Sequence, residues 1–94
     1  MAVSTIPNQF RMLRRSVNTG YFSINGNTEV NKEISFTVDS GYTFFGINRV
    51  ITSTPNIVIG NCYDSNGKFI LYVKNITSNQ LNVNVYVEYL ISKG

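Results

Sequence analysis

The side chains that could carry out acid–base chemistry are five carboxylates: Glu29, Glu33, Asp39, Asp64 and Glu88. Paired-carboxylate catalysis of the glycosidase type needs two of them to converge across a cleft. The alternating pattern instead predicts that Glu33 and Glu88 point outward from strands, and that Asp39 and Asp64 lie at turns. The chain has no histidine, which excludes Ser-His and Cys-His nucleophiles and ordinary zinc sites. We therefore expect a protein that is not an enzyme and has no cofactor or metal.

The single cysteine and one glycosylation motif carry little chemistry. Cys62 has no partner for an internal disulfide and lies in an apolar stretch, so we expect a buried small side chain. Asn75-Ile76-Thr77 matches an N-glycosylation acceptor, but Met1 is not followed by a signal peptide, and we interpret the match as accidental. No segment has the roughly 18 apolar residues of a membrane-spanning helix. A protein made in the cytoplasm and not inserted into a membrane is expected.

The basic residues cluster only at Arg11, Arg14 and Arg15. The net charge of +3 raises the hypothesis of nucleic-acid binding. No second basic run supports a phosphate-binding patch, so the preferred interpretation of the cluster is a solvated basic arm. Nucleic acid is not the expected partner.

Tyrosines and asparagines give the chain its potential for binding. They combine flat apolar rings with amide donors and acceptors, the groups with which proteins hold sugars and wet protein surfaces. The simpler interpretation is that such residues are ordinary constituents of polar β-structure. Some are large for a fully wet surface, so we expect a partner subunit or a ligand to cover them. The candidate binding or assembly surface consists of Tyr42, Ile70, Tyr72, Asn84 and Tyr86.

The element that must position these residues is a long last strand over residues 80–91. Its apolar and polar residues alternate along the whole length, which predicts a half-buried strand that crosses the domain. The outward side carries Asn82, Asn84, Tyr86 and Glu88. The inward side carries Leu81, Val83, Val85, Val87, Tyr89 and Ile91.

The turns within residues 57–91 predict an antiparallel meander of three strands. Its two three-residue loops would be closed by Gly67 and Asn79 in left-handed conformations. This register keeps the apolar residues on one face and places Lys68 between two carboxylates. The expected pairs are Asp64–Lys68, Tyr63–Phe69, Gly60–Tyr72, Ile59–Val73, Phe69–Val87, Leu71–Val85, Val73–Val83 and Lys68–Glu88.

The N-terminal half contributes further strands. Residues 10–15 fit a first or edge strand, although their pattern also allows a helix. Asn25-Gly26 is the dipeptide that most readily closes a tight hairpin after a strand over 21–24. A glycine inside a strand usually marks a bulge, so the strand over 42–52 should bend at Gly46. The strand over 30–38 has an inward set of Ile34, Phe36 and Val38.

About seven strands, frequent turn signals and no convincing helix predict an all-β fold. The expected architecture is a small antiparallel β-sandwich, jelly-roll-like, that ends in the C-terminal meander. Residues 1–19 would form an N-terminal arm with a possible first strand, and residues 20–94 a single domain. Because 94 residues support only a small core, a partner subunit would add stability.

Residues 30–91 resemble the small C-terminal β-sandwich modules of tail-fibre, baseplate and head-fibre proteins of bacteriophages that infect Gram-positive bacteria. The shared features are a strand opened by Gly41-Tyr42, a glycine hairpin over 63–67, a strand and turn over 71–78, and a final valine-alternating strand over 81–90. They mark a fold, so no functional residue is transferred. This chain starts at Met1 with a short arm where family members carry a long shaft.

The resemblance implies a virion protein made in the host cytoplasm. It would be a structural or host-surface-binding (adhesion) module without a cofactor, acting as a homo-oligomer with a trimer favoured, and a host cell-surface carbohydrate or protein would be its partner. The alternative is a free-standing small phage regulator that binds a host protein or nucleic acid through Arg11, Arg14 and Arg15.

Overall fold

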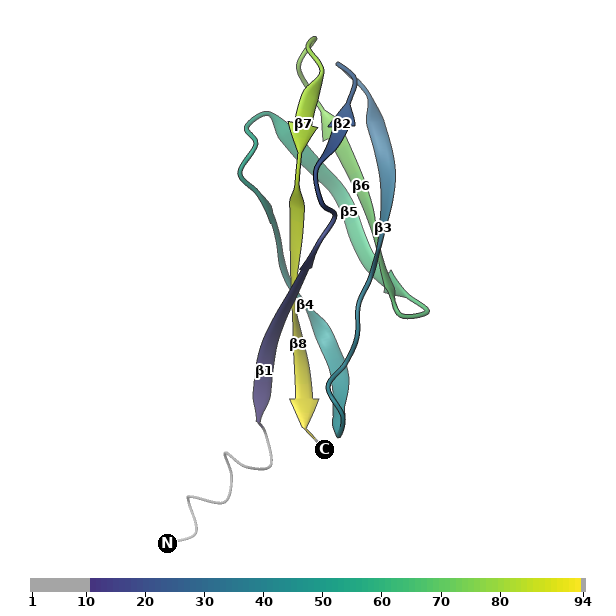
Figure 1. The fold of residues 1–94 in the computed structure, drawn as a ribbon, viewed down its shortest axis with the longest axis vertical. Helices are drawn as coiled ribbons and strands as arrows, with labels where there is room; N and C mark the ends of the chain where they lie inside the picture. The colour runs from purple at the N-terminus through teal and green to yellow at the C-terminus, as the bar shows by residue number, and fades with distance from the viewer. Residues whose placement is uncertain (1–10, 94) are drawn as a thin grey trace, which may run out of the picture.

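The computed structural model describes residues 11–93. They form eight strands: β1 (Met12–Asn18), β2 (Phe22–Ile24), β3 (Glu29–Ser35), β4 (Tyr42–Thr52), β5 (Ile57–Ser65), β6 (Lys68–Asn75), β7 (Leu81–Val83) and β8 (Val85–Lys93). The strands pair antiparallel in three small sheets of order β1-β8-β4, β2-β7 and β3-β6-β5 (Figure 1). No helix forms within residues 11–93, and so none there could cross a membrane. The predicted all-β class is confirmed.

The expected last strand is divided at Asn84 into β7 and β8. The stretch keeps its alternation, and five of its six predicted inward residues are buried while Leu81 is half-buried. Its pairing partner changes at the break, because β7 pairs with β2 whereas β8 lies between β1 and β4. Thr19 bridges the break, since its backbone nitrogen donates to the Val85 carbonyl at 2.9 Å and its hydroxyl accepts from the Val85 nitrogen at 3.0 Å.

The predicted three-strand meander is wrong. Strand β6 pairs with β3 and β5, and not with the β7–β8 stretch. The two apolar sets that were expected to be neighbours in one sheet therefore face each other across the core. Alternation predicts which side of a strand is buried. It does not tell whether two such strands pair in one sheet or pack face to face across the core, because both arrangements bury the same residues. The buried residues concerned are Phe69, Leu71 and Val73 on β6 and Val83, Val85 and Val87 on the last stretch.

The turn between β5 and β6 is tighter than predicted. Gly67 is left-handed as expected, with φ of 77°, but Asn66 is left-handed too, with φ of 50°. Two consecutive residues of this kind close a two-residue hairpin loop. The register near the turn is therefore shifted by one, and an irregularity after Ile59 restores the predicted Ile59–Val73 pair. In place of the other predicted pairs, the structure forms Ser65–Lys68, Asp64–Phe69, Tyr63–Ile70 and Asn61–Tyr72.

The first strand is confirmed in a displaced position. Strand β1 begins at Met12 and pairs with β8 along its whole length, which excludes the helical alternative there. Residues 1–10, which include most of the predicted arm and Phe10, lie outside the described residues. Strand β4 has the predicted bounds, and the register shift at Gly46 confirms the bulge.

The hairpin predicted at Asn25-Gly26 is wrong, because β2 and β3 belong to different sheets. The chain does turn here, but the left-handed residue is Asn27, with φ of 56°. Gly26 serves another purpose: a Cβ at this position would overlap the backbone of Ser78. The glycine therefore permits a close approach of two loops and does not form a type I′ turn.

The core lies between the buried sides of the three sheets. Its aromatic part is a cluster in which the rings of Phe36 and Phe69 stack with centroids 4.0 Å apart. Phe44 and Tyr89 pack around this pair at centroid distances of 5.2 to 5.9 Å. Of the predicted inward set on 30–38, Ile34 is buried and the other two residues are half-buried against the core. Each fully buried large side chain stabilises the fold by about 1.5–3 kcal/mol.

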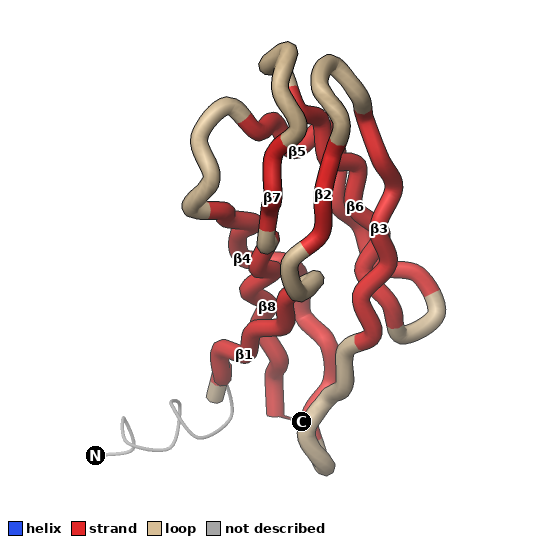
Figure 2. The backbone as a smooth tube through the Cα atoms, turned by 45° about the horizontal axis from the view of Figure 1, so that its top comes forward, coloured by secondary structure: helices blue, strands red, loops and turns tan. Residues whose placement is uncertain are grey.

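Residues 11–93 form a body that is elongated along its strands (Figure 1). Residues 11 and 93 lie at the same end, where the Lys93 nitrogen donates to the Arg11 carbonyl at 3.0 Å. The loops 25–28, 53–56 and 76–80 gather at the other end (Figure 2). We call these three segments the distal loops.

Candidate functional site

The candidate surface predicted from the sequence is divided by the fold. Ile70 and Tyr72 lie on the outward side of β6, whereas Asn84 and Tyr86 lie on the outward side of the β7–β8 stretch. The core separates these two sides, because β6 and β8 both direct their apolar residues into it. Tyr42 packs half-buried against the core, with the Lys93 ammonium 5.9 Å from its ring centroid. The five residues therefore do not form one surface.

The outward side of the β1-β8-β4 sheet has a charged centre at Glu88. Asn48 donates to Glu88 Oε1 at 2.6 Å, and Arg49 Nε lies 3.3 Å from the same oxygen. Arg14 approaches Oε2 at 3.8 Å from the other flank. These contacts leave the Glu88 side chain only 16 % exposed, although it points outward from the sheet.

A second irregularity in β4 explains this convergence. The register shifts between Ile47 and Arg49, so that Asn48 is an extra residue opposite Glu88. A bulge of this kind directs two consecutive side chains to the same side of a strand. Both Asn48 and Arg49 can therefore reach the one carboxylate.

Large apolar side chains surround this charged centre. Phe45, the extra residue of the first bulge, is 65 % exposed. Monomeric proteins rarely expose several large apolar groups on one side of a sheet unless that side binds something. We call this surface the Glu88 face; it consists of Met12, Arg14, Phe45, Asn48, Arg49, Ile51, Tyr86 and Glu88.

The outward side of the β3-β6-β5 sheet is a second surface of mixed character. Tyr63 and Val58 are exposed on β5, next to the half-buried Ile70 and Tyr72 of β6. The neighbouring Tyr72 phenol raises the pKa of Tyr63. The Lys68 ammonium lies 3.3 Å from Glu33 Oε1, which offsets both charges.

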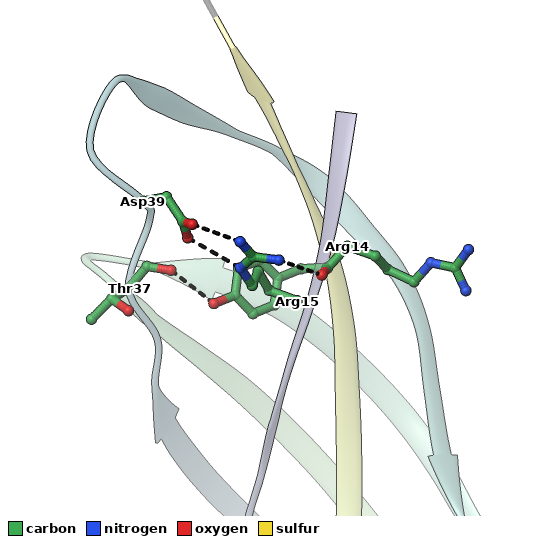
Figure 3. Close-up of polar contacts among 5 residues, drawn as sticks. Arg14, Arg15, Thr37 and Asp39 are labelled. Atoms are coloured by element: carbon green, nitrogen blue, oxygen red, sulfur yellow. Dashed lines mark hydrogen bonds and ion pairs between the residues drawn. The ribbon is translucent and has the colours of Figure 1, made fainter. Parts of the chain in front are cut away.

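Two arginines of the predicted basic arm, Arg14 and Arg15, lie on β1. Consecutive residues of a strand point to opposite sides, and Figure 3 shows Arg14 and Arg15 extending to opposite sides of β1. Arg14 reaches Glu88, and Arg15 lies on the inward side. Arg15 binds Asp39 through two bonds, Nη2–Oδ2 at 2.6 Å and Nε–Oδ1 at 3.2 Å. Arg15 lowers the pKa of Asp39, and Asp39 raises the pKa of Arg15. Arg11 is exposed just before β1.

The Arg15–Asp39 pair ties down the connection between β3 and β4. Next to it, the Tyr89 hydroxyl donates to the Thr37 carbonyl at 2.7 Å. Burial raises the pKa of Tyr89, as expected for a phenol at the edge of an aromatic core. This group of contacts closes the end of the core near residues 11 and 93, and its role is structural.

The distal loops are held together by the buried side chain of Asn75, a role that was not predicted from the sequence. Asn75 is 0 % exposed, and its Nδ2 donates to the carbonyls of Ile24 at 3.0 Å and Asn79 at 2.7 Å. Its Oδ1 accepts from the backbone nitrogen and the hydroxyl of Thr77 at 2.9 and 2.7 Å. A signal was present, because Asn75 continues the inward set Phe69, Leu71 and Val73 and is the polar member of it.

The glycosylation motif has no accessible acceptor in this fold. The Asn75 amide nitrogen uses both hydrogens inside the loop cluster. Glycosylation of the folded chain at this position would require the cluster to open.

The remaining chemistry of residues 11–93 is modest. These residues contain no group of three cysteine or acidic side chains that could hold a metal ion, and no pocket. Burial raises the pKa of the Cys62 thiol, which is half-buried against the core and opposite Leu71.

No family model, curated protein or solved structure matches this chain. Its function is therefore argued from its own residues and their geometry.

Proposed function

We propose that the chain is a non-catalytic module of a bacteriophage particle. It would be a β-sandwich with a structural or host-surface-binding role, made in the host cytoplasm and assembled as a homo-oligomer, preferably a trimer. The observation that carries the proposal is the Glu88 face, an outward sheet surface with several exposed large apolar side chains. The resemblance of residues 30–91 to phage fibre and baseplate modules supports the same function.

The chemistry of the Glu88 face suits burial against protein. Its apolar side chains gain about 25 cal/mol for each Å² removed from water. Its carboxylate is already contacted by Arg14, Asn48 and Arg49, so covering the face does not leave Glu88 unpaired, and the two arginines give the face one positive charge in excess.

The size of the face favours a trimer over a dimer. Three strands of about nine residues cover roughly 15 × 30 Å, or about 450 Å². A stable interface usually buries about 800 Å² per partner. A cyclic trimer brings two surfaces of each chain into contact, here the Glu88 face and a second one, and so approaches that value.

The test is the mass of the purified chain in solution, measured by light scattering at low and high salt. A trimer that persists at high salt is expected, because apolar burial is not screened by ions. Phe45→Ser and Ile51→Ser should shift the mass toward that of the monomer. Tyr21→Ser is the matched control, since Tyr21 is exposed in the connection before β2, outside both sheet faces. A wild-type chain that stays monomeric at about 100 µM would contradict the proposal.

The alternative function, a regulator acting through the three arginines, has less support. Arg14 and Arg15 are engaged within the fold and point to opposite sides of β1. Salt-sensitive binding to nucleic acid that disappears when Arg11, Arg14 and Arg15 are changed to alanine would favour this alternative.

A further inference from the structure

The distal loops are the part of the surface without charge. Their sequences are NGNT over 25–28, STPN over 53–56 and ITSNQ over 76–80. All eight basic and all five acidic residues of the chain lie elsewhere. The charged residues next to the loops, Glu29 and Lys74, are cross-strand partners and offset each other. This end of the molecule therefore presents amides and hydroxyls and carries almost no net charge.

The distal loops are locked together by hydrogen bonds. The Asn27 nitrogen donates to the Thr77 carbonyl at 2.8 Å, and the Ile76 nitrogen donates to the Asn56 carbonyl at 3.2 Å. These bonds join all three loops above the buried Asn75 amide. A surface that is already ordered loses little conformational entropy when a ligand binds.

The side chains that point away from this locked backbone have a consistent chemistry. A side-chain amide offers both donors and acceptors, which matches the hydroxyl groups of a sugar. Ile76 is 51 % exposed among them and offers an apolar contact for the C–H face of a sugar ring. The exposed polar side chains of the loops are Asn25, Asn27, Ser53, Asn56, Ser78, Asn79 and Gln80.

We infer that the distal loops form a binding tip for a neutral, hydroxyl-rich glycan. An anionic polymer would need lysine or arginine on the loops, and they have none. A protein partner would favour tyrosine, tryptophan or arginine as anchors, and the loops have none of these either. The inference rests on the proposed function, and the distal loops lie at the opposite end of the strands from residues 11 and 93 (Figure 1).

The tip binds weakly as a single copy and more strongly as an assembly. With no pocket in residues 11–93, a sugar stays largely in water and its dissociation constant is on the order of 1 mM. Several tips on one oligomer that engage a repeating glycan raise the apparent affinity by roughly 10²-fold or more.

The experiment is an NMR titration of the full ¹⁵N-labelled chain. The neutral probes are maltohexaose, N,N′,N″,N‴-tetraacetylchitotetraose and a rhamnose oligomer, each to about 20 mM, above the expected dissociation constant. The anionic probe is an oligogalacturonate of similar length. At least one neutral probe should shift the backbone and side-chain amides of the distal loops, and the anionic probe should not.

Variants distinguish binding at the distal loops from weak binding elsewhere on the chain. The side chains of Asn25 and Gln80 bond to each other at the surface, so the double variant N25A/Q80A should weaken binding about five-fold and keep the fold. Ile76→Ala should act in the same direction. Asn31→Ala, on the outward side of β3, is the matched control and should bind like the wild type. The inference is overturned if no neutral probe shifts the loops, if the shifts map to a sheet face, or if N25A/Q80A binds normally.

The Phe45→Ser variant distinguishes this inference from the proposed function. If the tip binds glycan, the monomeric variant should show the same loop shifts with a dissociation constant for short probes within about two-fold of wild type. A wild-type chain that is monomeric but shows these shifts would overturn the proposed assembly and support glycan binding by the distal loops. A trimer without loop shifts would support the proposed assembly and overturn the glycan-binding inference.

Discussion

Asn75 is the residue on which the distal loops depend. A polar side chain that is fully buried must have its hydrogen-bonding groups paired, and the four contacts of Asn75 satisfy its amide completely. One side chain therefore joins the end of β2 to the loop that follows β6. The position of the tip and the stability of the fold are linked through it.

Asn75→Ala should destabilise the protein by about 3 kcal/mol. It leaves the Ile24 carbonyl and the Thr77 nitrogen without their Asn75 partner and removes one of the two hydrogen bonds to the Asn79 carbonyl. The measurement is the free energy of unfolding from urea titration. Asn82→Ala, at an exposed position of β7, is the control and should change stability by less than about 0.5 kcal/mol. Equal effects of the two substitutions would contradict the role given to Asn75.

The Arg15–Asp39 pair should make stability sensitive to acid. Because the folded-state pKa of Asp39 is lowered, the pair stabilises the fold above the unfolded aspartate pKa of about 4. This contribution is lost as the pH falls through the lowered pKa. Asp39→Asn should therefore reduce Tm near neutral pH and make the acid decrease of Tm shallower.

The measurement for this prediction is Tm by circular dichroism between about pH 7 and pH 2. Asp64→Asn is the control, because Asp64 is exposed on β5 and forms no ion pair within residues 11–93. It should keep the acid decrease of the wild type. Parallel curves for Asp39→Asn and the wild type would show that another group causes the acid sensitivity.

At the scale of the elements, the bulges of β4 decide which side chains reach the outward surface. Without the irregularity at Asn48, only one of Asn48 and Arg49 would face Glu88. At the other bulge, Gly46 takes the place opposite Leu90 that Phe45 would otherwise have, so that Phe45 and Gly46 both lie on the outward side. The convergence of two side chains on Glu88 is therefore a product of the extra residue Asn48.

Gly26 and Gly46 should respond in opposite directions to a methyl group. Gly26→Ala places a Cβ on the backbone of Ser78 and should destabilise the fold by about 1–3 kcal/mol. Gly46→Ala meets no atom within 4 Å and should be neutral or raise stability by up to about 1 kcal/mol. Urea titration of both variants checks this, and a destabilised Gly46→Ala would mean that the bulge itself needs glycine.

At the scale of the whole molecule, the small number of strands explains why the outward faces matter. The β1-β8-β4 and β3-β6-β5 sheets each pack one side against the core and have an outward side that no other strand covers within residues 11–93. Large apolar residues such as Phe45 and Ile51 therefore stay in water in a single copy, and assembly is the direct way to bury them.

Much of the local structure was predictable from the sequence. The alternation over 80–91 predicted the buried valines, the bounds of β4 followed from its β-branched and aromatic run, and Gly67 was correctly assigned a left-handed conformation. The bulge at Gly46 followed from a glycine inside a strand. Each of these properties depends on neighbours in the chain, which the sequence displays directly.

Apart from the β5–β6 hairpin, the tertiary structure decided which strands pair and which residues meet. It placed β6 opposite β8 across the core, divided Ile70 and Tyr72 from Tyr86, and brought Arg15 to Asp39. These contacts depend on the packing of whole strands, and several pairings bury the same alternating residues equally well. The sequence by itself determined which side of each strand is buried. The relative stability of complete packings determined which residues share an outward surface, where the Asn75 amide is buried and how the distal loops meet.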